Sequence, residues 1–311
     1  MNSIYKLAKS VLFRFTPEQA HHIILSNLDW ATQLGAQKLV TRSFPENPIE
    51  IMGLRFPNCV GLAAGMDKDG EHVTAFGALG FGSVEIGTVT PKGQPGNPKP
   101  RLFRLIPDEA IINRMGFNNH GVDALIANVK RAKFQGVLGI NIGKNATTPI
   151  ENAVDDYLTC LTKVYDHASY ITVNISSPNT KNLRALQSED ELSKLLGTLK
   201  EEQARLQQQR GRYVPMAVKI APDLNLEEIE AIAQVVTQVE MDGVIATNTT
   251  IDKSSLGNHP LAGEAGGLSG LPVRAQSEYV LQHLVHALKG KLPVIGVGGI
   301  VAGQDAATKK R

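Results

Sequence analysis

The stretch VLGINIGKNATTPIENAVDDYLTCLTKVYDHASYITVNI, residues 137–175, contains the pattern that decides the fold. It begins with one apolar run, Val137–Ile142, and ends with another, Tyr170–Ile175, and a helical stretch lies between them. Both runs carry few charges and many β-branched residues, as expected of strands that are covered on both faces. The alternation of such strands with helices predicts a parallel sheet with helices outside it.

Comparable runs occur along the rest of the chain, and seven are found in all. The other five are Cys59–Ala64, Ser83–Val89, Met216–Ile220, Gly243–Thr247 and Pro293–Val297. An eight-stranded β/α (TIM) barrel is the most economical interpretation, and its active site would be built where the strands end. A doubly wound open sheet is the alternative, but no GxGxxG motif opens a helix after the first run, so a Rossmann fold is weakly supported.

Composition limits the function classes. The chain has 311 residues, of which 42% are hydrophobic and 20% charged, which is typical of a globular protein. Its formal charge of +2 lacks the basic excess of a nucleic-acid-binding protein. Cys59 and Cys160 form no CxxC pair, which favours a reducing compartment over a disulfide framework. No run approaches the roughly 18 to 20 apolar residues of a spanning helix, and no signal-peptide core is found, so these features alone favour the cytoplasm.

The N-terminal region predicts two amphipathic helices. Apolar residues recur at helical spacing from Ile4 to Phe15, and Thr16-Pro17 with Gln19 predicts a capped start of the second helix. The charges of the first helix are all basic, so the pair could lie on an anionic lipid surface. The alternative is that both helices bury their apolar sides against a larger domain. Residues Arg42–Pro48 are predicted to be a linker.

Asparagine recurs at or just beyond the predicted strand ends and in the long segment Pro91–Asn119, which is predicted to be a covering loop or small hairpin. These asparagines are Asn113, Asn141, Asn174, Asn179 and Asn248. A carboxamide offers both a donor and an acceptor, so a group of them suits a planar ring with alternating N–H and C=O edges, such as a pyrimidine or a flavin. For any one of them, a turn-forming role is the alternative.

Lysine, serine and glycine complete the predicted site. Lys219 lies inside an apolar strand and must find an anion, and Lys68 follows the first strand. Ser177 and Ser176, after the fourth strand, carry the hydroxyls best placed to act on an acidified carbon. The glycine-rich turns Gly266–Gly270 and Gly296–Gly299 suit a phosphorylated ligand, or are simply flexible loops. No metal-binding motif supports metal catalysis.

Taken together, these residues resemble the quinone-dependent, membrane-associated class 2 of the dihydroorotate dehydrogenase family. The motifs that carry the resemblance stand in the family's order from the N-terminal helices to about Ile300. They are GLAAGMDKDG, EIGTVTPKGQPGN, INRMGFNN, NISSPNT, VKIAPD, IATNTT, GGLSG and IGVGGI.

The resemblance implies an FMN-containing barrel, an oxidoreductase acting on a CH–CH group in pyrimidine (UMP) biosynthesis. It implies that dihydroorotate is oxidised to orotate and that a membrane quinone accepts the electrons. Ser177 corresponds to the catalytic base that removes the C5 proton while a hydride leaves C6 for flavin N5. The implied FMN-binding residues are Ala64, Gly65, Met66, Asp67, Lys68, Thr88, Asn141, Asn174, Lys219, Thr247, Gly270 and Gly299. The implied substrate-binding residues are Lys68, Asn113, Arg114, Met115, Gly116, Phe117, Asn174, Asn179, Asn248 and Thr249.

The resemblance also implies a domain division and a location. Residues 1–45 would form the helix pair of the quinone tunnel with its linker, and residues 46–311 the FMN-binding barrel. Residues 1–40 would make peripheral contact with the cytoplasmic face of the cell inner membrane, with no nucleic acid and no metal as partner.

After IGVGGI the family continues into an eighth strand and a final helix, whereas this chain continues only as VAGQDAATKKR. Seven runs likewise leave a barrel unclosed. The expectation from sequence is therefore a chain truncated at its C-terminus, either as an incomplete copy of a normal enzyme or as a product that folds poorly, binds little flavin and is weakly active or inactive. We expect the second for a chain made alone.

Two other functions remain open at the level of sequence. One is another FMN-dependent pyrimidine reductase, acting on a pyrimidine in RNA, which would show salt-sensitive RNA binding. The other is a degenerate, non-catalytic barrel that binds lipid through its N-terminal residues without turnover.

Overall fold

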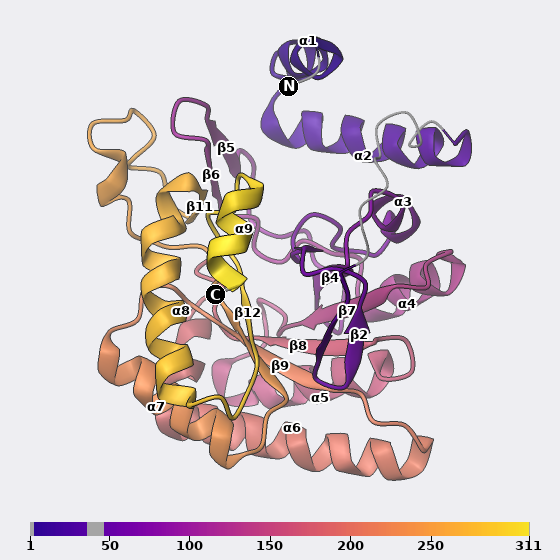
Figure 1. Ribbon diagram of the computed structural model, residues 1–311, viewed down its shortest axis with the longest axis vertical. Helices are drawn as coiled ribbons and strands as arrows, with labels where there is room; N and C mark the ends of the chain where they lie inside the picture. The colour runs from indigo at the N-terminus through magenta and orange to yellow at the C-terminus, as the bar shows by residue number, and fades with distance from the viewer. Residues whose placement is uncertain (1–2, 36–46, 311) are drawn as a thin grey trace.

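A computed structural model describes residues 3–35 and 47–310, and its main feature is a curled parallel sheet with helices on its outer face (Figure 1). Positions 42–46 of the predicted linker lie outside the described residues. Within these ranges the sheet has seven strands in the order β12-β10-β9-β8-β7-β4-β3. The strands are β3 (Gly61–Leu62), β4 (Ser83–Val89), β7 (Val137–Ile142), β8 (Tyr170–Asn174), β9 (Met216–Ile220), β10 (Gly243–Ala246) and β12 (Val294–Gly296).

The sheet confirms the predicted β/α barrel class. All neighbouring strands are parallel, and each strand lies within one of the seven runs predicted from sequence. The largest difference is at Cys59–Ala64, where only Gly61 and Leu62 pair with β4. Parallel strands present their carboxyl ends at one side of the sheet, and the candidate site lies there.

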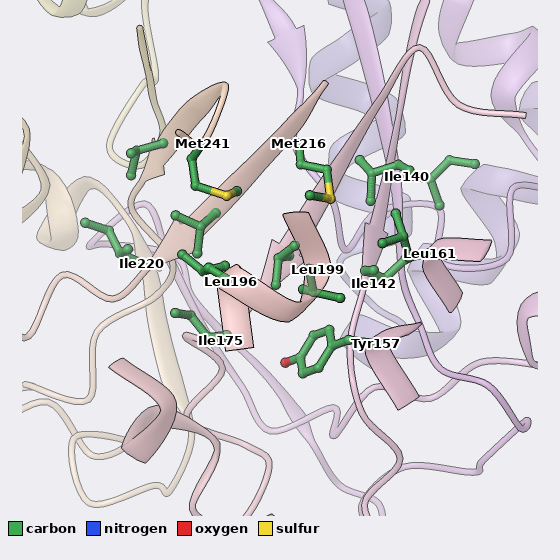
Figure 2. Packing of buried hydrophobic residues seen from close by; sticks show 14 of the residues in the cluster. Ile140, Ile142, Tyr157, Leu161, Ile175, Leu196, Leu199, Met216, Ile220 and Met241 are labelled. Carbon is green, nitrogen blue, oxygen red and sulfur yellow. The ribbon is translucent and has the colours of Figure 1, made fainter. Parts of the chain in front are cut away.

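The main hydrophobic core lies between the sheet and the outer helices (Figure 2). Strand residues such as Ile140 and Met216 pack there against Tyr157 and Leu161 of one helix and Leu199 of another. The outer helices are α3 (Val73–Ala78), α4 (Val122–Arg131), α5 (Ala153–Val164), α6 (Glu189–Arg210), α7 (Leu226–Gln238), α8 (Arg274–Leu288) and α9 (Gly303–Lys310). Burial of this many apolar side chains is the dominant favourable term in folding, and it fixes the strand ends relative to one another.

Two smaller sheets close the ends of the large one. The hairpin of β1 (Ile49–Ile51) and β2 (Leu54–Phe56) packs Phe56 against residues near the strand starts. At the opposite end, β5 (Leu102–Leu105), β6 (Ala110–Asn113) and β11 (Gly267–Gly270) form an antiparallel cover sheet.

The cover sheet confirms the small hairpin predicted within residues 91–119 and corrects the prediction of a loop at Gly266–Gly270. Residues 267–270 form a strand because their backbone pairs with β6. Gly267 is required here because a side chain would collide with Thr249.

The N-terminal helices α1 (Ser3–Leu12) and α2 (Pro17–Gln33) lie over the cover-sheet end of the molecule (Figure 1). The predicted capping box is present, because the Gln19 amide donates to the Thr16 hydroxyl and the Thr16 amide donates to the Gln19 side chain. Ala20 and Leu25 of α2 are buried against the body. No helix among the described residues has the length and apolarity that would let it span a bilayer.

An ion pair anchors α2 to the body. Arg101, just before β5, donates to the Glu18 carboxylate at 2.8 Å, and the Lys99 ammonium lies 3.3 Å from the same carboxylate. Burial alone would raise the pKa of Glu18, but the hydrogen bonds and charges of Arg101 and Lys99 lower it below its ordinary value. Glu18 is therefore ionised at neutral pH.

Candidate active site

A cavity of about 350 Å³ lies between the carboxyl ends of the strands and the cover sheet. Its walls combine backbone and side chains that follow several strands with residues of the cover sheet. They are His21, Ala63, Ala64, Gly65, Met66, Lys68, Thr88, Leu102, Ile111, Asn113, Met115, Gly116, Phe117, Asn174, Ser177, Pro178, Asn179, Lys219, Thr247, Asn248, Thr249, Ser269, Val273, Val297 and Gly298. Most of the residues predicted from sequence therefore share one cavity.

A buried chain of hydrogen bonds runs beneath the cavity across three neighbouring strands. The Asn174 amide donates to the Thr88 hydroxyl at 2.8 Å, and this hydroxyl donates to the Asn141 carbonyl oxygen at 2.6 Å. The Asn141 amide then donates to Glu85 at 2.9 Å. A carboxylate can only accept, so Glu85 sets the direction of every donor in the chain.

The same direction continues above Asn174. Asn248 donates to the Ser176 hydroxyl at 2.9 Å, and this hydroxyl donates to the Asn174 carbonyl oxygen at 3.0 Å. Both carboxamides are thus held in a defined orientation. Asn174 and Asn248 can therefore present a fixed pattern of donors and acceptors to a planar ring.

Lys219 supplies a buried positive charge. Its side chain projects from β9 and lines the cavity, and the residue is only 5% exposed. Among the residues that the structure describes, no carboxylate lies within ion-pair distance of its ammonium. A buried, unpaired ammonium is costly, so this wall of the cavity favours an anionic or electron-rich ligand.

Lys68 is a second cation, in the loop after β3. Its ammonium donates to the Gly65 carbonyl at 2.9 Å and lies at the cavity wall. Burial, assisted by repulsion from Arg101, lowers the pKa of Lys68 to about 8. Lys68 thus remains mostly charged at neutral pH, but it can lose its proton more readily than an exposed lysine.

Ser177 lies in the loop after β8, and it is buried while still reaching the cavity. Its hydroxyl oxygen accepts from the Asn179 backbone amide at 3.3 Å. The Asn179 side chain donates to the Asn113 backbone carbonyl at 3.1 Å, which ties the loop to the cover sheet. A proton acceptor, amide donors and two ammonium groups therefore surround one space.

Five predicted residues lie outside the cavity lining. Asp67 accepts from the amides of Glu71 and His72 near the start of α3, and Asn141 lies behind Thr88 in the buried chain. Arg114 turns outward to Glu264 at 2.6 Å. Gly270 ends β11, and Gly299 follows the lining residue Gly298.

His21 of α2 is a polar lining residue that the sequence did not indicate. Burial, with the nearby positive charges of Lys68, His22 and His72, lowers the pKa of His21 to about 4, so it is neutral at neutral pH. The helical periodicity places His21 on α2, but only the tertiary packing of α2 brings it to the cavity. No local signal could have identified it.

The cavity combines three features that suit planar, electron-rich ligands. The cation on one wall, the oriented carboxamides and the mainly apolar remainder are typical of cavities that hold such ligands. Within the described ranges, no group of His, Cys, Asp and Glu side chains is arranged to hold a metal ion.

Comparison with known proteins gives one consistent result. The sequence model of the family described as Dihydroorotate dehydrogenase matches residues 48–310. A protein of Neisseria meningitidis serogroup C / serotype 2a named Dihydroorotate dehydrogenase (quinone) is 64% identical over 308 residues, covering 99% of this chain and 91% of that protein. One of the same name from Acinetobacter baumannii is 56% identical with the same two coverages.

Solved structures agree with these relatives. A crystal structure of DHODH from Eimeria tenella in complex with ferulenol superposes with a TM-score of 0.85 at 39% identity, covering 94% of this chain and 83% of that one. The ligand-free form from the same organism gives a TM-score of 0.83 at 40% identity, with coverages of 94% and 86%.

Proposed function

The chain belongs to the dihydroorotate dehydrogenase family, and on that premise we propose how its cavity performs the reaction. The reaction is the oxidation of dihydroorotate to orotate with a quinone as electron acceptor, a step of pyrimidine biosynthesis. The observation that carries the proposal is that Ser177, Lys219 and Asn174 line one cavity.

Enzymes of this family use a flavin, and we propose that the flavin of this chain is FMN. The cavity residues fit it. Lys219 and the oriented Asn174 carboxamide would face its ring, with Thr88 beneath. The remaining proposed FMN positions are Ala64, Gly65, Met66, Asp67, Lys68, Asn141, Thr247, Gly270 and Gly299. When bound, FMN supplies the acceptor for the hydride that leaves C6 of dihydroorotate.

Ser177 removes the proton from C5. A serine hydroxyl is a weak base, but C5 lies next to a carbonyl and is therefore a carbon acid whose developing charge can be stabilised. As it takes the C5 proton, the Ser177 oxygen passes its own hydroxyl proton to water, and the Asn179 amide that donates to this oxygen would stabilise the negative charge that develops on it. Loss of the C5 proton and of the C6 hydride leaves the C5=C6 double bond of orotate.

The substrate ring would be held by amides and by a cation. Asn174 and Asn248 present their oriented carboxamides, and Lys68 attracts the substrate carboxylate. The other proposed contacts are Asn113, Arg114, Met115, Gly116, Phe117, Asn179 and Thr249.

Residues 1–45 form the quinone entrance and membrane contact, and residues 46–311 the FMN-binding barrel. Exposed apolar side chains of the N-terminal helices and of the residues that flank them support this division. They are Val11, Phe13, Phe15, Ile23, Ile24, Trp30 and Leu34. A surface this apolar favours peripheral insertion into a lipid interface, here the cytoplasmic face of the inner membrane.

Activity tests the reaction. The proposal predicts that the purified chain contains FMN and reduces a ubiquinone analogue when dihydroorotate is added, in contrast to the expectation from sequence that a chain made alone binds little flavin and is weakly active or inactive. Ser177→Ala should lower the rate of flavin reduction by about 10²- to 10⁴-fold and leave orotate affinity nearly unchanged, because proton transfer contributes chiefly to the transition state. Ser254→Ala, at an exposed serine, is the matched control. A large loss of orotate affinity in Ser177→Ala would make Ser177 a binding residue instead.

Trp30 tests the membrane contact directly. It is the only tryptophan and is 63% exposed, so its emission reports the environment of α2. Vesicles containing anionic phosphatidylglycerol should shift the emission to the blue, more strongly at low salt. Unchanged emission with these vesicles at low salt would contradict the membrane contact.

A further inference from the structure

One guanidinium group connects three of the loops that carry the site. Arg184 donates through Nε to the Ser176 carbonyl at 3.0 Å and through Nη2 to the Thr249 carbonyl at 2.9 Å. Its Nη1 donates to the Asp223 carboxylate at 2.7 Å. These partners follow β8, β10 and β9 respectively, so the planar fork of a single side chain fixes three strand ends.

The bond to Ser176 acts on the peptide that carries Ser177. The carbonyl of Ser176 and the amide of Ser177 belong to one planar peptide unit, so holding the carbonyl fixes the orientation of that plane. The orientation of this plane sets the direction in which the Ser177 side chain projects from the backbone. The bond to Thr249 likewise fixes the peptide plane between Thr249 and Thr250, in the loop after β10.

Asp223 holds the guanidinium in place. Its carboxylate accepts from the Thr250 hydroxyl and from the Gln276 amide of α8, the latter at 3.3 Å. The Arg184 and Asp223 side chains are only 20% and 14% exposed. Water therefore screens the pair less than it screens a surface ion pair.

Arg184 itself extends from a rigid platform. It lies in the short helix η3 (Leu183–Gln187), whose Leu183 and Leu186 are buried in the core. The Gln187 side chain accepts from the Ala221 amide at 2.9 Å, which fixes η3 to the end of β9. The fork is thus preorganised by its supporting contacts.

We propose that Arg184 is a positioning residue for the proton transfer, acting through the Ser176 carbonyl to aim the Ser177 hydroxyl at C5 of the substrate. This inference rests on the proposed role of Ser177. Small misplacements of a catalytic group cost rate: a 1 Å shift can cost about a hundredfold. Asp223 is the second member of the device.

Rapid mixing of the FMN-loaded full chain with dihydroorotate separates positioning from folding. Arg184→Met should lower the rate constant of flavin reduction by about 10- to 100-fold, with substrate affinity changed less than about threefold. Arg184→Lys should recover little, because an ammonium cannot reproduce the fork, and Asp223→Asn should give an intermediate loss. Deuterium at C5 should slow Arg184→Met more than the unmodified chain, because C5–H cleavage becomes more rate-limiting.

A double-mutant cycle provides the decisive readout. If Arg184 acts through Ser177, then Arg184→Met should cost less than about twofold in a Ser177→Ala background. Equal losses in both backgrounds, or an unchanged C5 isotope effect, would overturn the proposal. If Arg184→Met retains no FMN, the same cycle with Asp223→Asn decides in its place. If Ser177→Ala alone leaves the rate of flavin reduction unchanged, the proposed function itself is wrong. If Ser177→Ala slows flavin reduction but Arg184→Met and Asp223→Asn do not, only the positioning role of Arg184 is wrong.

Discussion

Glu85 on β4 accepts a hydrogen bond from the Asn141 carboxamide on β7 at 2.9 Å, across 56 positions of sequence. The other Glu85 oxygen accepts from the Tyr170 and Thr172 hydroxyls at 2.9 and 3.1 Å. Burial and the charge of Glu85 keep the pKa of Tyr170 well above its ordinary value, so Tyr170 stays a donor. The Glu85 carboxylate thereby orients the Asn141 carboxamide directly and the Asn174 carboxamide through the Thr88 hydroxyl.

Replacing Glu85 tests that orientation. Glu85→Leu leaves three buried donors without an acceptor, at about 1–3 kcal/mol each, and frees Asn141 to flip. Glu85→Gln keeps a carbonyl oxygen for Asn141, and the two hydroxyls can rotate to suit its amide. A flavin-fluorescence titration should show FMN affinity reduced at least about tenfold in Glu85→Leu and less than about threefold in Glu85→Gln. Thr172→Val is the control, since it removes one donor but not the Asn141 bond; equal affinities in both Glu85 variants would contradict the role.

Replacing Lys219 should raise the stability of the flavin-free chain but weaken its binding of FMN. Lys219→Met removes a buried, unpaired ammonium, so the flavin-free chain should unfold at a temperature a few degrees higher. The same change should weaken FMN binding by about a hundredfold, because the cation that we propose to face the flavin is lost. Thermal unfolding with and without FMN measures both effects.

Lys144 is the matched control for Lys219. It is also buried, but its ammonium donates to the carbonyls of Asn145 and Thr148. Lys144→Met should therefore lower the unfolding temperature and leave FMN affinity unchanged. A flavin affinity that falls equally in both variants would show that Lys219 has no special part in binding.

The titration of Lys68 predicts how orotate binding depends on pH. Burial lowers its pKa from the ordinary 10.5 to about 8, so Lys68 in the free site loses its positive charge as the pH rises through 8. Orotate affinity should be constant below that pH and fall by up to about tenfold per unit above it, until the raised pKa of the complex is passed. Calorimetric titration between pH 6.5 and 9.5 checks this. Lys68→Met should bind more weakly and show a flat profile; the same slope in both chains would assign the pH dependence to another group.

Replacing Glu18, the partner of Arg101, with its uncharged amide should have a large effect on stability. Glu18→Gln leaves a buried guanidinium without its counter-charge and should lower the free energy of unfolding by about 3 kcal/mol. Amide exchange should rise chiefly across α2. Asp123→Asn breaks the exposed Lys163 pair of 2.8 Å and should cost less than about 1 kcal/mol. Equal costs for the two variants would mean that α2 is held by its apolar contacts alone.

The strands could be predicted from sequence because strands that are buried on both faces contain many β-branched and other apolar residues and few charges. Met216–Ile220 and Val137–Ile142 form strands over the whole predicted runs. The strand pattern placed Ser177 after the fourth strand and Lys219 inside the fifth, and both line the cavity. The family and its quinone-dependent class are confirmed by the comparisons.

The features that sequence did not predict depend on contacts between distant segments. β11 is a strand only because β6 lies beside it, and its four residues carry no strand signal of their own. His21 reaches the cavity through the docking of α2, and Arg184 acts through partners 8 to 65 positions away. Periodicity and motif spacing describe neighbours along the chain, whereas these residues are defined by their neighbours in space.

The cover sheet constrains the order of events during synthesis. Its first two strands emerge early from the ribosome, but the third, β11, is made only after most of the sheet. Until β11 has been made, the cover sheet consists of β5 and β6 alone, and the carboxamides at the strand ends of a nascent chain are less covered. The cavity therefore gains its full cover late in synthesis, once β11 has paired with β6.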